Sequence, residues 1–201
     1  KLDSSGNNWL WAKNAGGSGT DYGSGIEVDA SGNSYVTGCF TGTATFGTTL
    51  TSNEGSTDIF IAKLDSSGNW LWANNAGGTS GDYGNGIAVD TRGNSYVTGY
   101  FNSNATFGST TLTSSGEYDI FVAKLDSSGN WLWAKKAGGT STDSGSGIAV
   151  DANRNSYITG QFSGTAGATF GNITFNGSGT YLDSDIFVTK VHIPYYPAGV
   201  S

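Results

Sequence analysis

The chain has 201 residues; only 12% are charged, 33 are glycine, and cysteine and histidine occur once each, as Cys39 and His192. A net charge of −7 argues against nucleic-acid binding, which needs clustered Lys and Arg, and the lone cysteine excludes an internal disulfide. The single histidine argues against a multi-histidine metal site, whereas 13% aromatic residues are too many for a disordered chain, so we expect a folded all-β protein.

The sequence repeats three times with a period of about 61 residues. The motif Asn-Trp-Leu-Trp-Ala occurs at 8–12, 69–73 and 130–134, and Gly-Ile-x-Val-Asp at 25–29, 86–90 and 147–151. The copies cover nearly the whole chain without a linker, which predicts one repeat domain over 1–201. Its repeats are placed at about 14–74, 75–135 and 136–201, with residues 1–13 completing a unit together with 185–192.

Each copy predicts four strands, and in the first copy these are Gly25–Asp29, Ser34–Phe40, Asp58–Leu64 and Trp70–Asn74. Trp9–Lys13 is a further copy of the fourth strand. The first and second strands, and the third and fourth, are joined by turns of the form Asp-x-x-Gly-Asn, in which Asp bonds the backbone ahead and Gly supplies a positive φ. One such turn carries Arg154 in place of glycine, so we expect it to be strained or shifted onto Asn153.

The predicted strands are apolar on both faces. In Asp58–Leu64, Ile59 and Ile61 point to one face while Phe60, Ala62 and Leu64 point to the other. Four-stranded sheets that are buried on both faces and repeat at a fixed period favour a β-propeller of three blades of about 61 residues. A three-fold lectin architecture, a β-trefoil or β-prism, is the alternative.

One stretch of the middle copy carries a family resemblance. The run from Asp82 to Gly99, which contains Gly-Ile-Ala-Val-Asp and Tyr-Val-Thr-Gly, and the strand Asp119-Ile-Phe-Val-Ala-Lys-Leu125 resemble the bacterial β-propeller repeat called SBBP. All three copies match, with departures at Cys39, Arg154 and Thr189 and in the Val191-His192 ending. The resemblance implies a propeller fold and a secreted or cell-surface protein, rather than one enzyme class.

The predicted blades do not close on themselves within the chain. Propellers have about four to eight blades, so two chains with three blades each would supply a six-bladed homodimer. In that arrangement Asp185–His192 of one chain pairs with Trp9–Lys13 of its partner, which removes open sheet edges. The rival interpretation is that the 201 residues are a piece of a longer repeat array.

The long connections between blades are where we expect a ligand. Asp21, Tyr22, Asp82, Tyr83 and Asp143 lie in or beside the segments 16–25, 77–86 and 138–147, at the same end as the variable loops 41–57, 102–118 and 163–184. Binding residues on repeat scaffolds concentrate in such loops. The alternative is that these aspartates bond backbone N–H groups of the glycine loops. The other repeated aspartates are interpreted as turn residues, and no metal site or cofactor is predicted.

The remaining aromatic and unusual residues receive structural interpretations. The six tryptophans could stack on sugars, but their place in the outermost strand favours packing between blades. The segment Ala-Thr-Phe-Gly at 44–47, 105–108 and 168–171 predicts a small extra β element whose phenylalanine plugs the blade. Cys39 is a poor nucleophile candidate without a histidine nearby in the sequence, and His192 with 194–197 is interpreted as an end cap or a partner-contacting tail.

Two functions follow as expectations. The first is a non-catalytic, extracellular or cell-surface binding module that recognises a glycan or another surface ligand at its loop-bearing end. The second is a structural protein of a surface, matrix or filament whose copies contact one another. No asymmetric catalytic set is visible, so we expect no enzyme activity. The sequence has no stretch of 18 apolar residues that could span a membrane, and no signal peptide is present in the chain as given.

Overall fold

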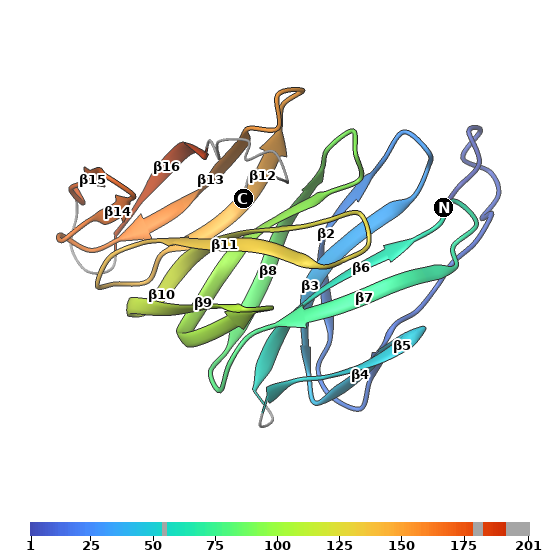
Figure 1. Ribbon diagram of the computed structural model, residues 1–201, viewed down its shortest axis with the longest axis horizontal. Coiled ribbons are helices and arrows are strands. Elements are labelled where there is room, and N and C mark those ends of the chain that lie inside the picture. Colours follow the sequence, from blue (N-terminus) through green and yellow to red (C-terminus); the bar gives the residue numbers. More distant parts are fainter. Residues whose placement is uncertain (54–55, 179–182, 192–201) are drawn as a thin grey trace, which may run out of the picture.

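The computed structural model describes residues 1–53, 56–178 and 183–191, and its regular structure consists of β-strands (Figure 1). Within these three segments no α-helix occurs. Three main antiparallel sheets follow one another along the chain and stand side by side, with the middle sheet between the other two. The prediction of an all-β protein made of repeated antiparallel sheets is therefore confirmed.

The sheets share one strand order, in which neighbours along the chain are neighbours in the sheet. The first sheet contains β2 (Tyr22–Val28), β3 (Ser34–Thr41), β6 (Thr57–Leu64) and β7 (Trp70–Ala76). The middle sheet contains β8 (Asp82–Val89), β9 (Ser95–Phe107), β10 (Thr110–Leu125) and β11 (Trp131–Ala137). The third sheet contains β12 (Ser144–Val150), β13 (Ser156–Ser163) and β16 (Ser184–Val191).

Short extra strands form where the sequence predicted an additional β element. They are β1 (Gly16–Gly17), β4 (Thr43–Phe46) and β5 (Thr48–Thr51) beside the first sheet, and β14 (Ala168–Phe170) and β15 (Ile173–Phe175) beside the third. In the middle copy the same element is an extension of β9 and β10, whose ladder continues to Phe107 opposite Thr110. The phenylalanine of this element plugs the sheet as expected, since Phe46 is buried against Phe60 and Trp70.

The hairpin turns follow the predicted Asp-x-x-Gly-Asn chemistry. In the turn after β2, the Asp29 carboxylate accepts hydrogen bonds from the Ser31 and Asn33 backbone N–H groups at 2.9 and 3.0 Å. The glycines of the five Gly-containing turns have positive φ angles, between 73° at Gly6 and 89° at Gly129. Arg154 also takes a positive φ, 66°, so the turn keeps its register and Arg154 adopts the strained conformation.

Apolar side chains fill the space between sheets as well as the outer part of each sheet. One cluster joins Ile59 and Ile61 of β6 to Ile87, Val97 and further residues of the middle sheet. A second, around Phe40, Phe46 and Phe60, lies within the first copy. The strands are thus buried on both faces where a neighbouring sheet is present, as expected for stacked repeat sheets.

The N-terminal segment differs from its predicted structure. Trp9–Lys13 does not form a strand: Leu2 and Trp9 make an isolated antiparallel bridge. The strand that it was expected to join, β16, lies in the third sheet, whereas residues 1–13 lie beside the first sheet at the other end of the array (Figure 1). Because the two are so far apart, they do not pair within one chain, and pairing between copies stays a prediction. His192 and 194–197 lie outside the described residues.

Candidate functional site

The three predicted aspartates occupy equivalent buried or half-buried positions at the start of the first strand of each sheet or directly before it. Asp82 Oδ2 accepts a hydrogen bond from the Gly78 N–H group at 2.8 Å, and its Oδ1 accepts one from Asn102 at 3.2 Å. Asp143 repeats this with Gly139 and Ser163, at 2.6 and 3.0 Å. Asp21 accepts from Gly17 at 2.9 Å. These carboxylates tie the connecting segments to the sheets and match the alternative interpretation given to them.

Burial dominates the electrostatics of these carboxylates. It raises the pKa of Asp82 to about 7, against the lowering effect of the two N–H donors, and the Asp58 carboxylate raises it further. Burial likewise raises the pKa of Asp143 to about 6. The turn aspartates behave oppositely: hydrogen bonds from Asn155 hold the pKa of Asp151 below its ordinary value. The pKa of the buried aspartates is therefore set mainly by burial, and that of the turn aspartate by its hydrogen bonds.

The two predicted tyrosines have different surroundings. Tyr22 is exposed over 63% of its surface, whereas Tyr83, its equivalent in the middle copy, belongs to a cluster of three tyrosines. The Tyr83 ring stacks on Tyr100, with centroids 4.8 Å apart and an interplanar angle of 23°. Tyr118 meets Tyr100 edge-on at 5.3 Å and 83°. Three strands of the middle sheet, β8, β9 and β10, supply one ring each.

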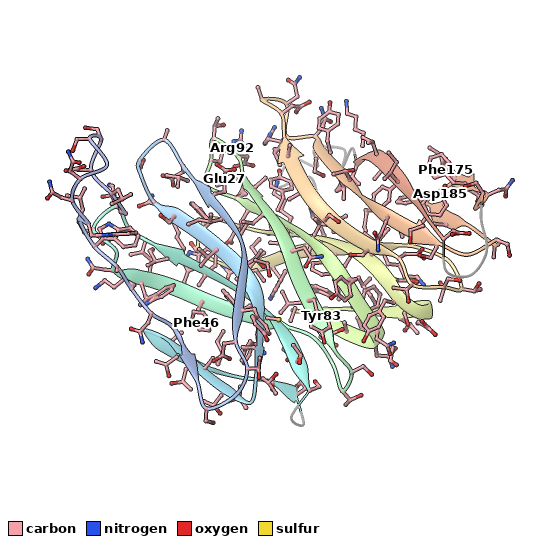
Figure 2. The ribbon with its side chains drawn as sticks, turned by 180° about the vertical axis from the view of Figure 1, so that it is seen from behind. Glu27, Phe46, Tyr83, Arg92, Phe175 and Asp185 are labelled. Atoms are coloured by element: carbon pink, nitrogen blue, oxygen red, sulfur yellow. The ribbon has the colours of Figure 1, made fainter. Side chains whose placement is uncertain are left out.

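These rings form one side of a pocket between the middle and third sheets. The opposite side is polar and comes from Thr142, Ser144 and Gln161, and the cavity has a volume of about 350 Å³. The Asn85 side chain donates a hydrogen bond to the Gly145 carbonyl oxygen at 2.8 Å and joins the two sheets. Figure 2 shows Tyr83 at the opposite end of the strands from Glu27 and Arg92. The tyrosine pocket thus opens at the loop-bearing end, where a ligand was expected.

The pocket combines flat aromatic faces with neutral hydrogen-bonding groups. Burial raises the pKa of Tyr100 and of Tyr118 above the ordinary tyrosine value, so both hydroxyl groups stay protonated at neutral pH and can donate or accept. Ser144, Thr142 and Gln161 add donors and acceptors that carry no charge. Such a site suits a neutral ligand with an apolar face and several hydroxyl groups.

Sequence reasoning identified Tyr83 but missed Tyr100 and Tyr118. The equivalents of the three tyrosines are Tyr22, Cys39 and Thr57 in the first copy, and Ser144, Gln161 and Ser184 in the third. The aromatic trio therefore occurs in the middle copy alone. A position-by-position comparison of the three copies could have found this trio, because Tyr100 and Tyr118 have no aromatic equivalent in the other two copies.

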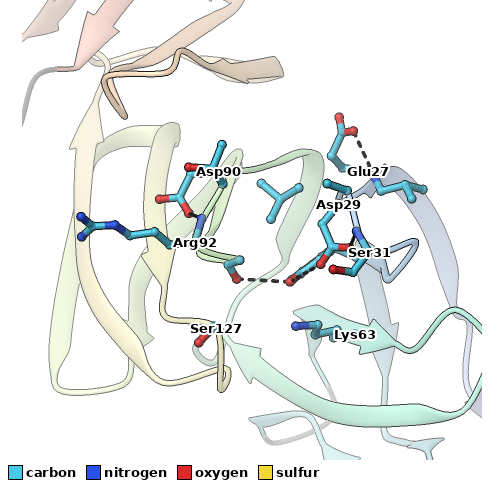
Figure 3. A pocket seen from close by; sticks show the side chains of 13 residues that line it. Glu27, Asp29, Ser31, Lys63, Asp90, Arg92 and Ser127 are labelled. Carbon is cyan, nitrogen blue, oxygen red and sulfur yellow. Dashed lines mark hydrogen bonds between the residues drawn. The ribbon is translucent and has the colours of Figure 1, made fainter.

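A second pocket lies at the hairpin end, between the first and middle sheets (Figure 3). It has a volume of about 380 Å³ and is lined by charged and polar side chains that include Glu27, Asp29, Lys63, Asp90 and Arg92. The Tyr35 hydroxyl bridges its two walls by donating toward Asp29 Oδ2 and the Gly93 carbonyl oxygen, at 3.2 and 3.3 Å. The hydrogen bond from Tyr35 to Gly93 thus joins the first and middle sheets across this pocket.

The polar groups of the hairpin-end pocket belong to a repeated arrangement. Lys63 lies over the Tyr35 ring at 4.7 Å, as Lys124 lies over Tyr96 at 4.6 Å. Tyr96 also bonds a turn aspartate, Asp90, at 3.2 Å. An arrangement of tyrosine, lysine and aspartate that recurs between copies stabilises the repeat, so we assign this pocket a structural role and take the tyrosine pocket as the candidate site.

Among the residues that the structure describes, no three His, Cys, Asp or Glu side chains gather closely enough to hold a metal ion. In the same part of the chain, no helix has the length and apolar character needed to cross a membrane.

Comparison with known proteins identifies the class of repeat. A family model described as a beta-propeller repeat, SBBP, matches residues 72–104 and 132–161. These two stretches of the chain therefore match the β-propeller repeat that its sequence resembles, and the expected resemblance is confirmed there. The two matched stretches contain β8 and most of β9, and β12 and most of β13, the strands that begin the middle and third sheets.

A curated relative extends the likeness to a second group of repeat proteins. An uncharacterized WD repeat-containing protein of Acanthamoeba polyphaga mimivirus is 31% identical over 114 residues, a match that covers 48% of this chain. The match covers 8% of the relative, so this chain spans a small part of that protein's length.

Proposed function

We propose that the three main sheets are blades of a β-propeller and that the chain is a non-catalytic binding module. Its ligand is a carbohydrate, bound in the tyrosine pocket of Tyr83, Tyr100 and Tyr118. The observation that carries this proposal is that the aromatic trio breaks the repeat: it occurs once, in a hollow, at the end of the strands where the loops vary. Structural residues recur in every copy, whereas a specific site needs an arrangement that occurs once.

The chemistry of the pocket supports a sugar over a charged ligand. Stacked tyrosine faces fit the apolar C–H face of a sugar ring, and the neutral side chains opposite can bond its hydroxyl groups. The pocket volume of about 350 Å³ suits one or two sugar rings. The resemblance to SBBP repeats supports an extracellular or cell-surface location, where such ligands are displayed.

A glycan array followed by calorimetric titration tests the proposal. Two variants, Tyr100→Gln and Tyr118→Thr, place in the middle copy the residues that the third and first copies already hold, so the fold should tolerate them. We expect each to weaken binding about two- to tenfold, since a contact with an aromatic ring contributes about 0.5–1.5 kcal/mol. Tyr22→Ser, which removes the exposed tyrosine of the first copy, should leave the affinity unchanged. Retained binding in both pocket variants, or an array without hits, would contradict the proposal.

The second candidate function is a structural protein whose copies assemble on a surface, in a matrix or in a filament. The observation that favours it is the uncovered face of β16, where Ile186 and Val188 are exposed over 87% and 72% of their surfaces. A structural protein would assemble and yet bind no glycan on the array. The WD repeat-containing relative agrees with either function, because propellers commonly act as scaffolds for binding.

A further inference from the structure

The last sheet exposes a residue that the first two sheets bury against a neighbour. Ile59, Ile120 and Ile186 are equivalent residues of β6, β10 and β16. Ile59 and Ile120 are 0% and 1% exposed, whereas Ile186 is 87% exposed. The first two pack where the next sheet has a glycine: a Cβ on Gly84 would lie 3.1 Å from Ile59, and one on Gly145 would lie 3.2 Å from Ile120. Ile186 is the equivalent side chain in the third sheet, but there no further sheet covers it among the described residues.

The first sheet exposes the other half of this contact. Gly23 is the equivalent of Gly84 and Gly145, and no described atom lies within 4 Å of the position that its Cβ would take. On the same strand Ile26 is 66% exposed, whereas its equivalent Ile87 in the middle sheet is 6% exposed. The β2 strand therefore presents a surface of the kind that β8 and β12 use to cover the preceding sheet.

A second pair of complementary features involves the tryptophans of the outer strand. In the first sheet Trp70 packs on Gly47, where a Cβ would lie 2.8 Å from it, and in the middle sheet Trp131 packs on Gly108 at 2.7 Å. The third copy has the equivalent Gly171, and no described atom lies within 4 Å of its Cβ position. A groove of about 380 Å³ is open there, lined by Phe170, Gly171, Ile158, Val191 and others.

The N-terminal segment carries the tryptophan that fits this groove. Trp9 is the equivalent of Trp70 and Trp131, and it is 75% exposed. Trp11, two residues on, already occupies its repeat position: it donates to the Ser66 carbonyl oxygen at 3.1 Å, as Trp72 donates to that of Ser127 at 3.1 Å. The segment thus sits against the first sheet as the outer strand of a preceding sheet would, with Trp9 turned to solvent.

We propose that a second copy of this chain docks on the third sheet and completes it. Residues 9–15 of the second copy pair with β16, Trp9 enters the groove at Phe170 and Gly171, and Ile186 packs on Gly23 of that copy. The contact repeats one that the chain already makes twice, between the first and middle sheets and between the middle and third. Because each copy carries both halves of the contact, two copies satisfy each other and close into a pair.

The known ladders fix the register of this pairing. In the first sheet Ala62 lies opposite Ala73 and Ile59 opposite Ala76, and in the middle sheet Ala123 lies opposite Ala134. By equivalence, Thr189 of one copy lies opposite Ala12 of the other, and Ile186 lies opposite Ala15. The outward residue of the motif keeps its exposure in a paired strand, since Leu71 and Leu132 are 53% and 52% exposed and Leu10 is 57% exposed.

Sedimentation equilibrium of the 201-residue chain provides the first test. We expect a mass of twice 20.7 kDa at micromolar concentrations. Trp9→Ser should weaken the association of the two copies at least tenfold. Leu10→Ser should leave the association unchanged, because Leu10 lies on the face of the paired strand that stays exposed. A monomer throughout this range, or equal effects of the two substitutions, would overturn the proposal.

Cysteine cross-linking tests the register and the occupant. A chain with Ala12→Cys is mixed with a chain carrying Thr189→Cys, and we expect a disulfide-linked product of two chains under mild oxidation. The pair Ala12→Cys with Lys190→Cys, shifted by one residue, should react at least tenfold more slowly. A chain that carries both Ala12→Cys and Thr189→Cys should give dimers linked twice. A monomer cross-linked to itself, or a ladder of larger masses, would overturn the two-copy closure. Failure here leaves the carbohydrate proposal standing, because the tyrosine pocket lies within one chain.

Discussion

Asp58 of β6 and Asp82 of β8 belong to neighbouring sheets and meet at Gly77. A Cβ atom on Gly77 would lie 2.6 Å from Cγ of Asp58 and 2.9 Å from Oδ2 of Asp82. The middle and third sheets repeat this relationship, since Asp119 and Asp143 flank Gly138 at 2.7 and 2.9 Å. Two buried carboxylates from different sheets therefore approach each other at each junction, and the glycine between them has no room for a side chain.

This junction predicts that stability falls as the pH rises from 5 to 7. Burial raises the pKa of Asp82 to about 7 and that of Asp58 to about 6, above the value of about 3.9 expected in the unfolded chain. A raised pKa in the folded state contributes stability that is present below about pH 4 and is lost as the pH rises through the folded value. Urea denaturation at pH 5, 6 and 7 should show a decrease in the free energy of unfolding, and the free energy should level off between pH 7 and pH 8.

Asp82→Asn should flatten this pH dependence, because it removes one of the groups that titrate in that range. The amide keeps an acceptor for the Gly78 N–H group, but its NH₂ group cannot accept from Asn102, so some stability is lost at every pH. Asp126→Asn is the matched control: hydrogen bonds lower the pKa of this turn aspartate, so its effect on the slope lies below pH 5. An identical slope in Asp82→Asn and the unaltered chain would show that Asp82 stays ionised throughout.

Arg154→Gly should stabilise the protein. Arg154 has a φ of 66° at a turn position where the other hairpins of this type carry glycine with the same sign of φ. A non-glycine residue in that conformation costs about 1–2 kcal/mol, and the greater freedom of glycine in the unfolded chain offsets about half of the gain. We expect an increase in the free energy of unfolding of up to about 1 kcal/mol, measured by urea denaturation. Gly93→Arg at the equivalent turn should have the opposite sign.

Local chemistry explains how much could be predicted from sequence. The turn at Asp29 could be predicted because its hydrogen bonds reach residues two to four positions ahead, and the strands could be predicted because alternating apolar residues recur in every copy. Trp70 and Trp72 could be assigned to packing because their motif lies in the outermost predicted strand. These features depend on neighbours in the sequence or on the repeat itself.

The features that the sequence did not predict depend on contacts between strands and between sheets. Tyr83, Tyr100 and Tyr118 lie on three strands, and their association requires the register of β8 against β9 and of β9 against β10. The conformation of Trp9–Lys13 depends on whether its pairing strand is present beside it. Neither the pairing register nor the presence of a neighbouring sheet is encoded in the residues close by.

Trp72→Ala should destabilise the junction between the first and middle sheets. The Trp72 ring packs on Gly129, where a Cβ would lie 2.8 Å from it, and its Nε1 donates to the Ser127 carbonyl oxygen at 3.1 Å. Loss of a large aromatic residue that packs in this way costs about 3 kcal/mol. The control is Leu71→Ala on the exposed face of the same strand, which should cost well under 1 kcal/mol. Similar costs for the two variants, measured by thermal unfolding, would contradict this role.

Thr98→Val should cost more than the same change in the third sheet. Thr98 is fully buried beneath β12 and donates to the Phe121 carbonyl oxygen at 2.8 Å, so loss of this bond should cost about 1 kcal/mol. Thr159 makes the equivalent hydrogen bond to Phe187 at 2.9 Å, but its side chain is exposed. At low protein concentration water can therefore take the place of the lost hydrogen bond in Thr159→Val. If a second copy covers the third sheet, the cost of Thr159→Val should rise toward that of Thr98→Val as the protein concentration increases. Chemical denaturation at two concentrations measures this, and a cost for Thr159→Val that does not change with concentration would argue against such a cover.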